Sequence, residues 1–319
     1  MQEQRNGGTR LKMYLKFKKF LVILLLIFIL ILISAFLILY KMQKDTHTLV
    51  VNKINLSYSD LPNDLENYKI GFVSDTHIGL STNLKFFDSI IKTLNSLDLD
   101  ILLLGGDYIW MKESALFQYP RNSLFNDIEF KLNAEKIYFY NIEKFSSVKT
   151  KDGIYAVYGN HDNWIFPNLL KKISKHKESK IKLKGESFNY IKKGDSNLSI
   201  FTFQDFWKKI PNVENHNFKL KNNEFRILIA HNPDTISYIN KYIPLEYNLS
   251  LSGHTHAGQI RIPFIPKASN TYYKEYVLGL SKIKKNSYHY TSSGIGYTSV
   301  PFRFNTKPEI AVFTLVKNK

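Results

Sequence analysis

The chain has 319 residues, 44% of them hydrophobic, and a formal net charge of +17 at pH 7. It contains no cysteine, which excludes disulfide bonds and thiolate metal sites. No phosphate-binding loop of the G-x-x-x-x-G-K-[ST] type, no fixed-period repeat and no extended low-complexity segment appears in it.

The first predicted element is a membrane anchor near the amino terminus. Leu21 to Tyr40 is a run of twenty residues without a charge. At 1.5 Å per residue such a helix spans about 30 Å, the hydrocarbon thickness of a bilayer. A cleaved signal peptide is the alternative, but its apolar region is about 7–15 residues long and ends at a small-x-small site. This run is longer and ends in LILYKMQK, so we expect one uncleaved transmembrane helix at residues 21–40.

The charges beside this helix predict its orientation. The basic residues before it are Arg5, Arg10, Lys12, Lys16, Lys18 and Lys19, and those after it are Lys41, Lys44 and Lys53. Because the more positive flank stays in the cytoplasm, residues 1–20 are expected to form a basic cytoplasmic tail. The rest of the chain would then lie outside the inner or plasma membrane of a bacterium. Residues 41–65 are expected to form a linker and residues 66–319 one large α/β domain.

Five blocks of polar side chains follow, each directly after an apolar, β-rich run. The runs read KIGFV, DILLL, GIYAV, RILI and LEYNLSL. The blocks after them are Ser74-Asp75-Thr76-His77, Gly105-Gly106-Asp107, Gly159-Asn160-His161-Asp162, Ala230-His231-Asn232 and Gly253-His254-Thr255-His256. Because a strand delivers its end to a fixed place in a sheet, five strand ends can direct side chains to one point. Two carboxylates, one amide oxygen and several imidazoles would meet there. This set suits Mn, Fe or Zn and is large enough for two ions.

Each block has an ordinary explanation when it is taken alone. A strand-end aspartate such as Asp107 is usually a turn residue or a helix cap. A buried histidine such as His231 is more often a hydrogen-bonded core residue, and Asn160-His161 is commonly a turn. The ordered series of five favours a metal site. Alternation of side chains along a strand further predicts that both members of the pair at 75 and 77 share one face, as do those at 254 and 256.

Several stretches between and after the blocks are assigned by their patterns. Asn83 to Leu97 has apolar residues at helical spacing and should cover the sheet. Tyr108 to Val148 is a long, aromatic-rich excursion, which either packs on the sheet as helices or forms a cap or lipid-facing surface. Pro167 to Ser174 is expected to be helical, and Ser187 to Phe203 and Tyr288 to Val316 are expected to form short strands.

The blocks D-x-H, G-D, G-N-H-D, a lone His and G-H-x-H, in this order, resemble the calcineurin-like metallophosphoesterase superfamily. GIYAVYGNHD, LIAHNPD, LSLSGHTHAGQIRIPF and SSGIGYTSVPFRFNTKPEIAVFTL extend the resemblance over Lys69 to Val316. They are similar to the membrane-associated bacterial branch, which includes exported phosphodiesterase-type members and enzymes that hydrolyse UDP-2,3-diacylglucosamine. The resemblance implies a four-layer αββα sandwich, here preceded by one transmembrane helix.

The resemblance also implies a cofactor, two divalent metal ions (Mn, Fe or Zn), and a role for each residue. The implied ligands of the first ion are Asp75, His77 and His256, those of the second are Asn160, His231 and His254, and Asp107 bridges the two. A metal-bridging hydroxide would attack phosphorus in line with the leaving oxygen. His161 would lie beside the ions without ligating them and, when protonated, would stabilise the developing charge. Asp107 and His161 are therefore the expected catalytic residues.

Two positions depart from the family's pattern. Many members have G-D-x-x-D at the second block, where the last aspartate orients the catalytic histidine, but here Trp110 replaces it. This replacement puts His161 as a strong general acid in doubt, unless Asp162 or Asp205 supplies the missing carboxylate. The other departure is Ala257, where glycine commonly follows the H-x-H pair. One added methyl is tolerated there unless the backbone needs a positive φ.

The basic residues suggest further contacts. Arg261 follows the H-x-H block and Arg303 follows Gly294-Ile295-Gly296. Either could bind a substrate phosphate with its planar fork, or could be an ordinary packing residue. The net charge has three explanations, which are attraction to anionic headgroups, concentration of phosphate-bearing substrates and a lysine-rich background composition. Nucleic acid is not an expected partner, because no recognised binding module is present.

These features together predict a membrane-anchored phosphoesterase with two metal ions. It would hydrolyse a phosphodiester or pyrophosphate, on a lipid or lipid precursor such as UDP-2,3-diacylglucosamine. A cytoplasmic domain would favour the nucleotide-lipid pyrophosphatase, and an external one an envelope phosphodiesterase. A protein phosphatase is a weaker alternative, because Trp110 breaks the G-D-x-x-D pattern. The alternative from another class is a catalytically silent metal-binding scaffold, although every implied ligand is kept. No obligate protein partner is expected.

Overall fold

The computed structural model describes residues 2–79, 82, 84–110, 127–165, 180–183, 186–211, 218–265, 269–298 and 300–318. The chain forms two compact units, Met1–Lys44 and Asp45–Lys319. The first unit consists of one helix, and the second contains both large sheets.

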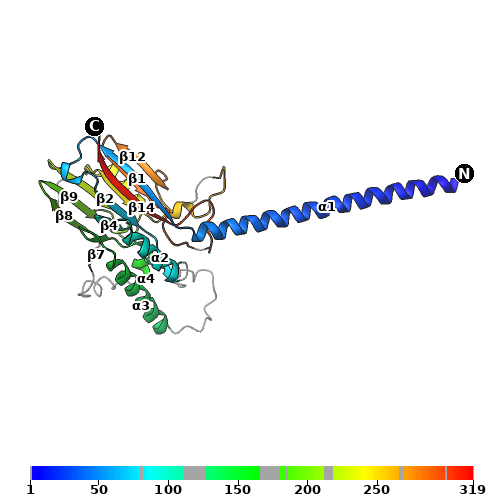
Figure 1. Ribbon diagram of the computed structural model, residues 1–319, viewed down its shortest axis with the longest axis horizontal. Coiled ribbons are helices and arrows are strands. Elements are labelled where there is room, and N and C mark those ends of the chain that lie inside the picture. The colour runs from blue at the N-terminus through cyan, green and yellow to red at the C-terminus, as the bar shows by residue number, and fades with distance from the viewer. Residues whose placement is uncertain are drawn as a thin grey trace. The chain divides into compact units, whose positions relative to one another are not determined.

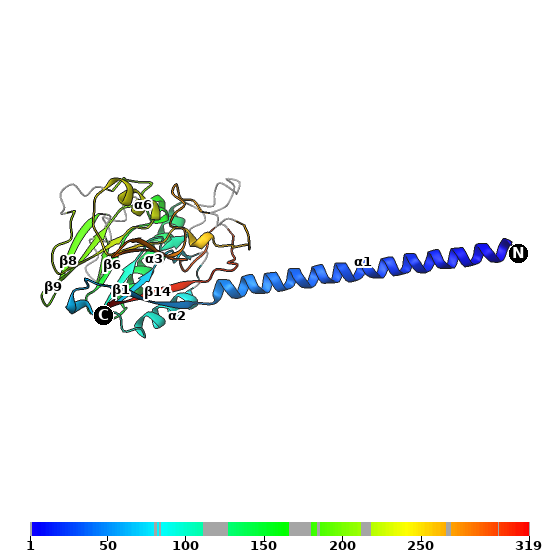
Figure 2. The same ribbon diagram turned by 90° about the horizontal axis from the view of Figure 1, so that it is seen from above.

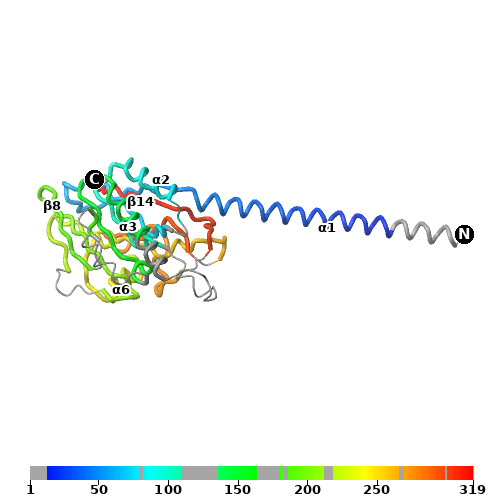
Figure 3. The backbone as a smooth tube through the Cα atoms, turned by 90° about the horizontal axis from the view of Figure 1, so that it is seen from below, coloured from blue at the N-terminus to red at the C-terminus, as the bar shows by residue number. Residues whose placement is uncertain are grey.

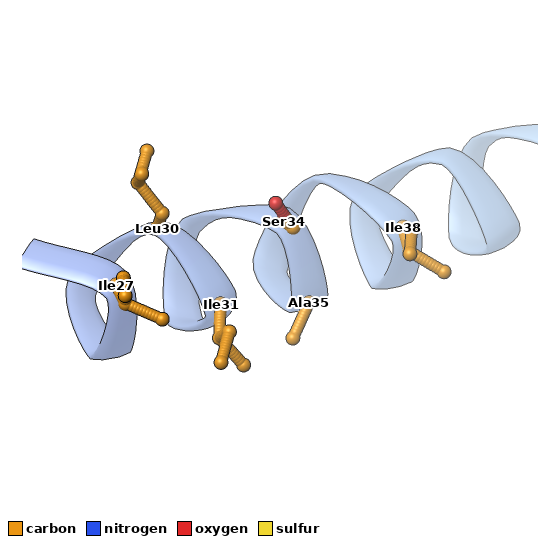
Figure 4. A pocket seen from close by; sticks show the side chains of 6 residues that line it. All are labelled: Ile27, Leu30, Ile31, Ser34, Ala35 and Ile38. Carbon is orange, nitrogen blue, oxygen red and sulfur yellow. The ribbon is translucent and has the colours of Figure 1, made fainter. Parts of the chain in front are cut away.

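The helix α1 runs from Gln2 to His47 (Figure 1). Its segment from Met13 to His47 is long and apolar enough to cross a membrane, and its most apolar window is entirely exposed. A helix that is apolar on every side needs an apolar environment, so this segment is a candidate membrane span. One side has a shallow groove, where the small residues Ser34 and Ala35 lie between larger aliphatic side chains (Figure 4).

Six strands form the first sheet, which contains the first three motif-bearing strands. In spatial order they are β1 (Val50–Tyr58), β14 (Glu309–Lys317), β2 (Lys69–Val73), β4 (Ile101–Leu104), β6 (Ile154–Ala156) and β7 (Ile181–Leu183). Strands β2, β4, β6 and β7 are parallel. Strand β14 is antiparallel to β2 and parallel to β1. The carboxyl ends of β2, β4 and β6 therefore meet at one edge.

Six further strands form the second sheet. Their order is β12 (Gly279–Lys284), β13 (Ser287–Thr291), β11 (Leu249–Ser252), β10 (Glu224–Ile229), β9 (Ser196–Thr202) and β8 (Ser187–Lys193). The four central strands are parallel, and the two edge strands β12 and β8 are antiparallel to their neighbours. A separate two-stranded pair joins β3 (Ile78–Gly79) to β5 (Ile109–Trp110).

Side-chain alternation explains why the two sheets face each other. In β4, Ile101 and Leu103 enter the core between the sheets, whereas Leu102 and Leu104 enter the core on the helical side. Strand β10 repeats this pattern in the second sheet, since Ile227 joins the central core and Leu228 the opposite one. Strands that are apolar on both faces are covered on both faces.

Helices cover the two outer faces. The helices α2 (Leu84–Asn95) and α3 (Asp127–Ser146) lie on the first sheet, with Phe87 and Tyr138 buried there. The helix α6 (Pro233–Tyr242) lies on the second through Ile236 and Ile239. Figures 2 and 3 show α2 and α6 on opposite sides of the sheets. The short helices η1 (Asn63–Leu65), α4 (Asn160–Ile165) and η3 (His256–Gly258) belong to connecting loops. The predicted four-layer αββα sandwich, with one apolar amino-terminal helix, is confirmed.

The structure confirms some of the predictions for single segments and corrects others. The expected linker at residues 41–65 contains β1, which pairs with β14 over nine residues, so that part of the stretch belongs to the first sheet. The helix expected at Asn83 to Leu97 is α2. In the aromatic excursion, Tyr138 and Phe145 are buried against the first sheet, which agrees with the packing interpretation. The helix expected at Pro167 to Ser174 lies outside the described residues.

Candidate metal centre

Each of the five polar blocks begins within a few residues of a strand end, as predicted. Strand β2 ends at Val73, β4 at Leu104, β6 at Ala156, β10 at Ile229 and β11 at Ser252. Backbone hydrogen bonds then join the blocks. The Asp75 amide donates to the Gly106 carbonyl at 2.8 Å, and the Gly253 amide donates to the His231 carbonyl at 2.9 Å. The His254 amide joins the two sheets by donating to the Asp75 carboxylate at 3.0 Å.

The side chains do not converge by strand alternation, so that part of the prediction is wrong. The strands end before the functional residues, and the backbone turns into the left-handed region instead. Five of the seven predicted ligands have positive φ, and these are Asp75 (52°), His77 (45°), Asp107 (54°), His254 (69°) and His256 (48°). This conformation costs a non-glycine residue about 1–2 kcal/mol. Such strain is stored where the surrounding structure enforces it, and functional sites are its usual location.

The first cluster consists of Asp75, His77 and His256, whose ligand atoms lie within 4.8 Å of one another. His77 Nε2 is 3.1 Å from His256 Nε2, which is 3.5 Å from Asp75 Oδ1. The opposite ring nitrogens face backbone carbonyls, His77 Nδ1 at 3.4 Å from Ile109 O and His256 Nδ1 at 3.2 Å from Gly296 O. When each Nδ1 carries its hydrogen toward that carbonyl, both Nε2 atoms direct lone pairs at each other. A cation between them removes this repulsion.

The second cluster brings Asn160, His231 and His254 together beside Asp107. His231 Nε2 lies 3.1 Å from Asn160 Oδ1 and 3.2 Å from Asp107 Oδ2. His254 Nδ1 lies 2.9 Å from Asn160 Oδ1 and 3.3 Å from His231 Nε2. His231 Nδ1 is 2.8 Å from the Gly105 carbonyl, to which it donates in the tautomer that exposes Nε2. Oxygen and nitrogen acceptors then face one another, as they do around a divalent metal ion.

Asp107 connects the two clusters. Its Oδ2 lies 3.7 Å from His77 Nε2 in the first cluster and 3.2 Å from His231 Nε2 in the second. The same oxygen is 4.0 Å from His161 Nε2. A buried carboxylate in this position can face two ions at once.

The electrostatics of the cluster call for positive charge at its centre. Burial alone would raise the pKa of Asp107, but His231 and His161 hold it well below its usual value. Burial opposes protonation of His231, yet the carboxylates around it, chiefly Asp107, raise its pKa to about 10. Burial lowers the pKa of His77 and of His254 to about 3, so both rings are neutral and able to ligate a metal at neutral pH. A divalent ion supplies the charge that these carboxylates attract.

Asp162 holds the second and third blocks together. Its carboxylate accepts hydrogen bonds from the amides of Asp107 at 2.8 Å, Tyr108 at 3.0 Å and Gly159 at 2.8 Å. Glycine is required at position 159, where the backbone lies against the Asp107 side chain, because a Cβ there would overlap the Asp107 carboxylate. Asp162 therefore fixes the backbone, which differs from the suggested role as the partner of His161.

His161 sits between the clusters. Its amide donates to Asp107 Oδ1 at 2.9 Å, and its ring stands edge-on to His77 at 5.1 Å between centroids. Asp205 is the other suggested partner of His161. Burial raises the pKa of the Asp205 carboxyl to about 6, and the charge of His231 is the strongest of those that act to lower it. The carboxylate that faces the His161 ring is thus Asp107. The side chain of Trp110 lies outside the described residues.

The two candidate phosphate-binding arginines differ. Arg303 is fully buried, and its guanidinium donates to the carbonyls of Ser293 and Gly296 and lies 3.4 Å from His256 Nδ1. It packs behind His256, which agrees with the packing role, one of the two roles that the sequence left open for Arg303. Arg261 is half-buried, and its amide donates to Phe304 O at 2.9 Å.

Sequence reasoning missed two kinds of contact at the site. The carbonyls of Gly105, Ile109 and Gly296 orient histidine rings, and no side-chain pattern identifies them. Trp207 stands edge-on to His254 with centroids 4.8 Å apart, and it is 39% exposed. It follows Asp205 in a loop after β9, where the sequence has none of the five motif blocks.

Comparisons with known proteins agree with this geometry. Residues 68–258 match the family model for calcineurin-like phosphoesterase. YkuE, an uncharacterized metallophosphoesterase of Bacillus subtilis, is 28% identical over 278 residues, which cover 86% of this chain and 88% of that protein. An uncharacterized metallophosphoesterase of Helicobacter pylori is 28% identical over 256 residues, 78% of this chain and 60% of its own length. A Bos taurus transmembrane protein with metallophosphoesterase domain is 22% identical over 279 residues, 83% of this chain and 56% of its own.

Proposed function

The chain belongs to the calcineurin-like phosphoesterase family, whose members are metal-dependent phosphoester hydrolases, and from this premise we propose that it acts as a membrane-anchored enzyme with two divalent ions. Its substrate would be a phosphodiester or pyrophosphate of a lipid or lipid precursor. The observation that carries the proposal is the position of Asp107, whose one carboxylate oxygen faces His77 on one side and His231 on the other.

The residues fit such a pair of ions. Asp75, His77 and His256 would hold the first ion, Asn160, His231 and His254 the second, and Asp107 would contact both. The first cluster supports this assignment, because the facing lone pairs of His77 and His256 repel one another unless a cation lies between them. In the second cluster, the carboxylates that raise the pKa of His231 attract the same positive charge. Once bound, divalent ions polarise phosphoryl oxygens and supply a nucleophilic water at neutral pH. The candidate ions are Mn, Fe and Zn, all of which bind oxygen and nitrogen ligands of this kind.

The chain's own residues would organise the reaction around the substrate. Asp162 holds the Asp107 backbone, so that the bridging carboxylate is fixed before substrate arrives. His161 would orient the phosphoryl group by donating a hydrogen bond from its ring. Burial lowers the pKa of His161, so its neutral form would be the donor at neutral pH. A neutral donor polarises the phosphoryl group and leaves protonation of the leaving group to water or to the substrate.

The proposed location is the inner membrane of a bacterium. The candidate span in α1 supports an anchor, and the excess of basic residues before the span supports a cytoplasmic tail. In that orientation the hydrolase domain lies outside and acts as an envelope phosphodiesterase. The opposite orientation would favour UDP-2,3-diacylglucosamine, which the resemblance to the bacterial branch suggests.

The test uses the full-length chain in detergent, first treated with chelator and then loaded with manganese, iron or zinc. Bis-p-nitrophenyl phosphate and UDP-2,3-diacylglucosamine are the substrates, and metal content is measured in parallel. Two bound ions with metal-dependent hydrolysis of either substrate would support the proposal, and the preferred substrate would decide between the two locations. Two bound ions without turnover of any phosphodiester or pyrophosphate would instead indicate a metal-binding scaffold.

A further inference from the structure

We propose that residues 262–265, together with Val300, form a membrane-contact surface that enters the same bilayer as α1. Hereafter these residues are called the apolar patch. Its large side chains are exposed, with Ile262 at 51%, Phe264 at 105%, Ile265 at 59% and Val300 at 44% of full exposure. Phe264 has a φ of 66°, so the backbone accepts a strained conformation while its ring faces solvent. Exposed apolar residues that are scattered singly need no explanation, but a cluster of them marks an interaction surface.

The two segments of the apolar patch are connected to each other. Ile260 forms a β-bridge with Phe304, and the Arg261 amide donates to the Phe304 carbonyl at 2.9 Å. The Gln259 side chain donates to the carbonyls of Thr298 at 2.9 Å and Val300 at 2.8 Å. The exposed side chains of both segments therefore belong to one rigid support rather than to two independent loops.

The same support is tied to the chain just after the apolar run. Thr46 Oγ1 accepts a hydrogen bond from the Arg303 amide at 2.7 Å, and Asp45 Oδ2 accepts one from the Asn305 amide at 2.9 Å. Asp45 and Thr46 are both buried. Asp45 is the fifth residue after Tyr40, and five residues reach at most about 17 Å. Whatever the angle at which the helix leaves the domain, the residues that carry the patch stay close to the end of the span.

Charge also favours a bilayer as the occupant. Residues 260–265, 269–274 and 300–308 contain no acidic residue, and their exposed or half-buried basic residues are Arg261, Lys274 and Lys307. Apolar side chains that enter lipid, with basic residues around them at headgroup depth, are typical of interfacial membrane contacts. A binding surface for an acidic protein would share the basic residues but would not need a fully exposed phenylalanine at its centre.

On the premise of the proposed function, membrane contact by the patch also indicates the class of substrate. His256 in the first cluster and Gln259 beneath the patch belong to the same turn of chain. If the patch lies in the bilayer, the metal centre is held near the headgroups, and the substrate class is a membrane phospholipid ester approached from its own surface. Soluble phosphate esters would then be accepted without being favoured.

Because the chain lacks cysteine, a single introduced cysteine can report on the patch. Phe264→Cys in the full-length chain is labelled with a polarity-sensitive fluorophore and reconstituted in phosphatidylethanolamine–phosphatidylglycerol vesicles. Tyr190→Cys is the matched control, since Tyr190 is an aromatic residue of β8 with 59% exposure. We expect blue-shifted emission at residue 264, quenched by lipids with a nitroxide on the acyl chain, and neither effect at residue 190. Unshifted emission at residue 264 would overturn the inference. So would a blue shift without lipid quenching, which would indicate a second copy of the chain.

A second measurement separates this inference from the proposed function. In the triple variant Ile262→Ser, Phe264→Ser and Ile265→Ser, we expect hydrolysis of phosphatidyl-p-nitrophenol in vesicles to fall roughly tenfold, since the reacting group is no longer positioned at the surface. Hydrolysis of soluble bis-p-nitrophenyl phosphate should be unchanged. An equal loss on both substrates would mean that the loop supports the metal centre, against the inference. If the unaltered chain hydrolyses neither, the proposed function fails while the fluorescence result still decides the membrane contact.

Discussion

The space between the two sheets and the edge that carries the metal centre differ in backbone conformation and in the kind of side chain that they bury. Between the sheets, regular strands alternate and their inward side chains form a large cluster of buried aliphatic and aromatic residues. At the edge, the strands have ended, the backbone is left-handed, and buried carboxylates and imidazoles face one another. The first region gains free energy by excluding water. The second stores backbone strain, and it also holds electrostatic repulsion that binding of a cation would offset. The stability of the sheets therefore maintains a site that would not be stable alone.

The largest expected effect comes from removing the residue that joins the two clusters. Asp107→Ala should abolish binding of both ions and lower kcat/KM by on the order of 10³-fold or more, about 4 kcal/mol of transition-state stabilisation. Metal analysis and hydrolysis of bis-p-nitrophenyl phosphate measure the effect. The control is Asp88→Ala, since Asp88 is an exposed residue of α2. Normal activity in Asp107→Ala would show that the two-ion assignment is wrong.

Truncation in the region between the sheets should change stability instead of chemistry. Leu103 is fully buried there, so Leu103→Ala should lower the free energy of unfolding by about 2–5 kcal/mol through lost transfer energy and a cavity. Activity per folded molecule should persist. Urea unfolding of the detergent-solubilised, metal-free chain measures this loss. Leu84→Ala, at a leucine that is 52% exposed, should change stability by about 0.5 kcal/mol at most. Equal losses in the two variants would contradict the distinction between the regions.

A histidine within the second sheet gives a pH-dependent comparison. His289 is fully buried between Ser250 and Thr291, and burial lowers its pKa to about 3. In the unfolded chain its pKa is about 6.5. Between pH 3 and pH 6.5 the unfolded chain binds a proton at His289 that the folded chain does not bind. The free energy of unfolding therefore loses nothing from this residue above pH 6.5, and the loss grows as the pH falls toward 3. At pH 5 the loss is about 2 kcal/mol.

The variant His289→Gln should remove this contribution to the pH dependence. The free energy of unfolding is measured by urea in the metal-free chain at pH 7.5 and at pH 5. The decrease between these two pH values should be about 2 kcal/mol smaller in the variant than in the unaltered chain. The same difference in both proteins would show that His289 is not held neutral by burial.

The smallest expected effect lies at Ala257 in the metal-centre loop, which has a φ of 56° and is fully buried. A left-handed alanine is strained, so Ala257→Gly should stabilise the chain by up to about 1 kcal/mol, less the contribution of the lost methyl. Ala156→Gly is the matched control, because Ala156 is equally buried but lies in β6. It should destabilise by about 1 kcal/mol. Thermal unfolding of both variants measures the contrast, and a destabilised Ala257→Gly would mean that the loop is not strained.

The same contrast explains what could be predicted from the sequence. The run DILLL predicted β4, since its residues are apolar on both faces and the strand is covered on both faces. The order of the five blocks predicted which side chains would meet. The local path was not predictable, because left-handed turns at Asp75 and His254 depend on contacts between distant loops rather than on neighbouring residues.

Positions that depend on tertiary contacts show the same limit. The alanine at position 257 was expected to be tolerated unless φ is positive, and the structure has it positive. The sequence left open whether Arg303 binds a phosphate or packs, because its environment comes from the Ser293 and Gly296 carbonyls, which no motif specifies. Strand β1, within the expected linker, was missed because its partner, β14, lies about 260 residues later in the chain.

That pairing has a consequence for how the protein is made. Strand β14 lies between β1 and β2 in the first sheet, so β1 can join this sheet only after a strand made much later in synthesis has been inserted beside it. Until then the edges of β1 and β2 have no partner, and exposed edges of this kind are where chains pair wrongly or are cleaved. The first sheet is therefore completed only after β14 has been synthesised.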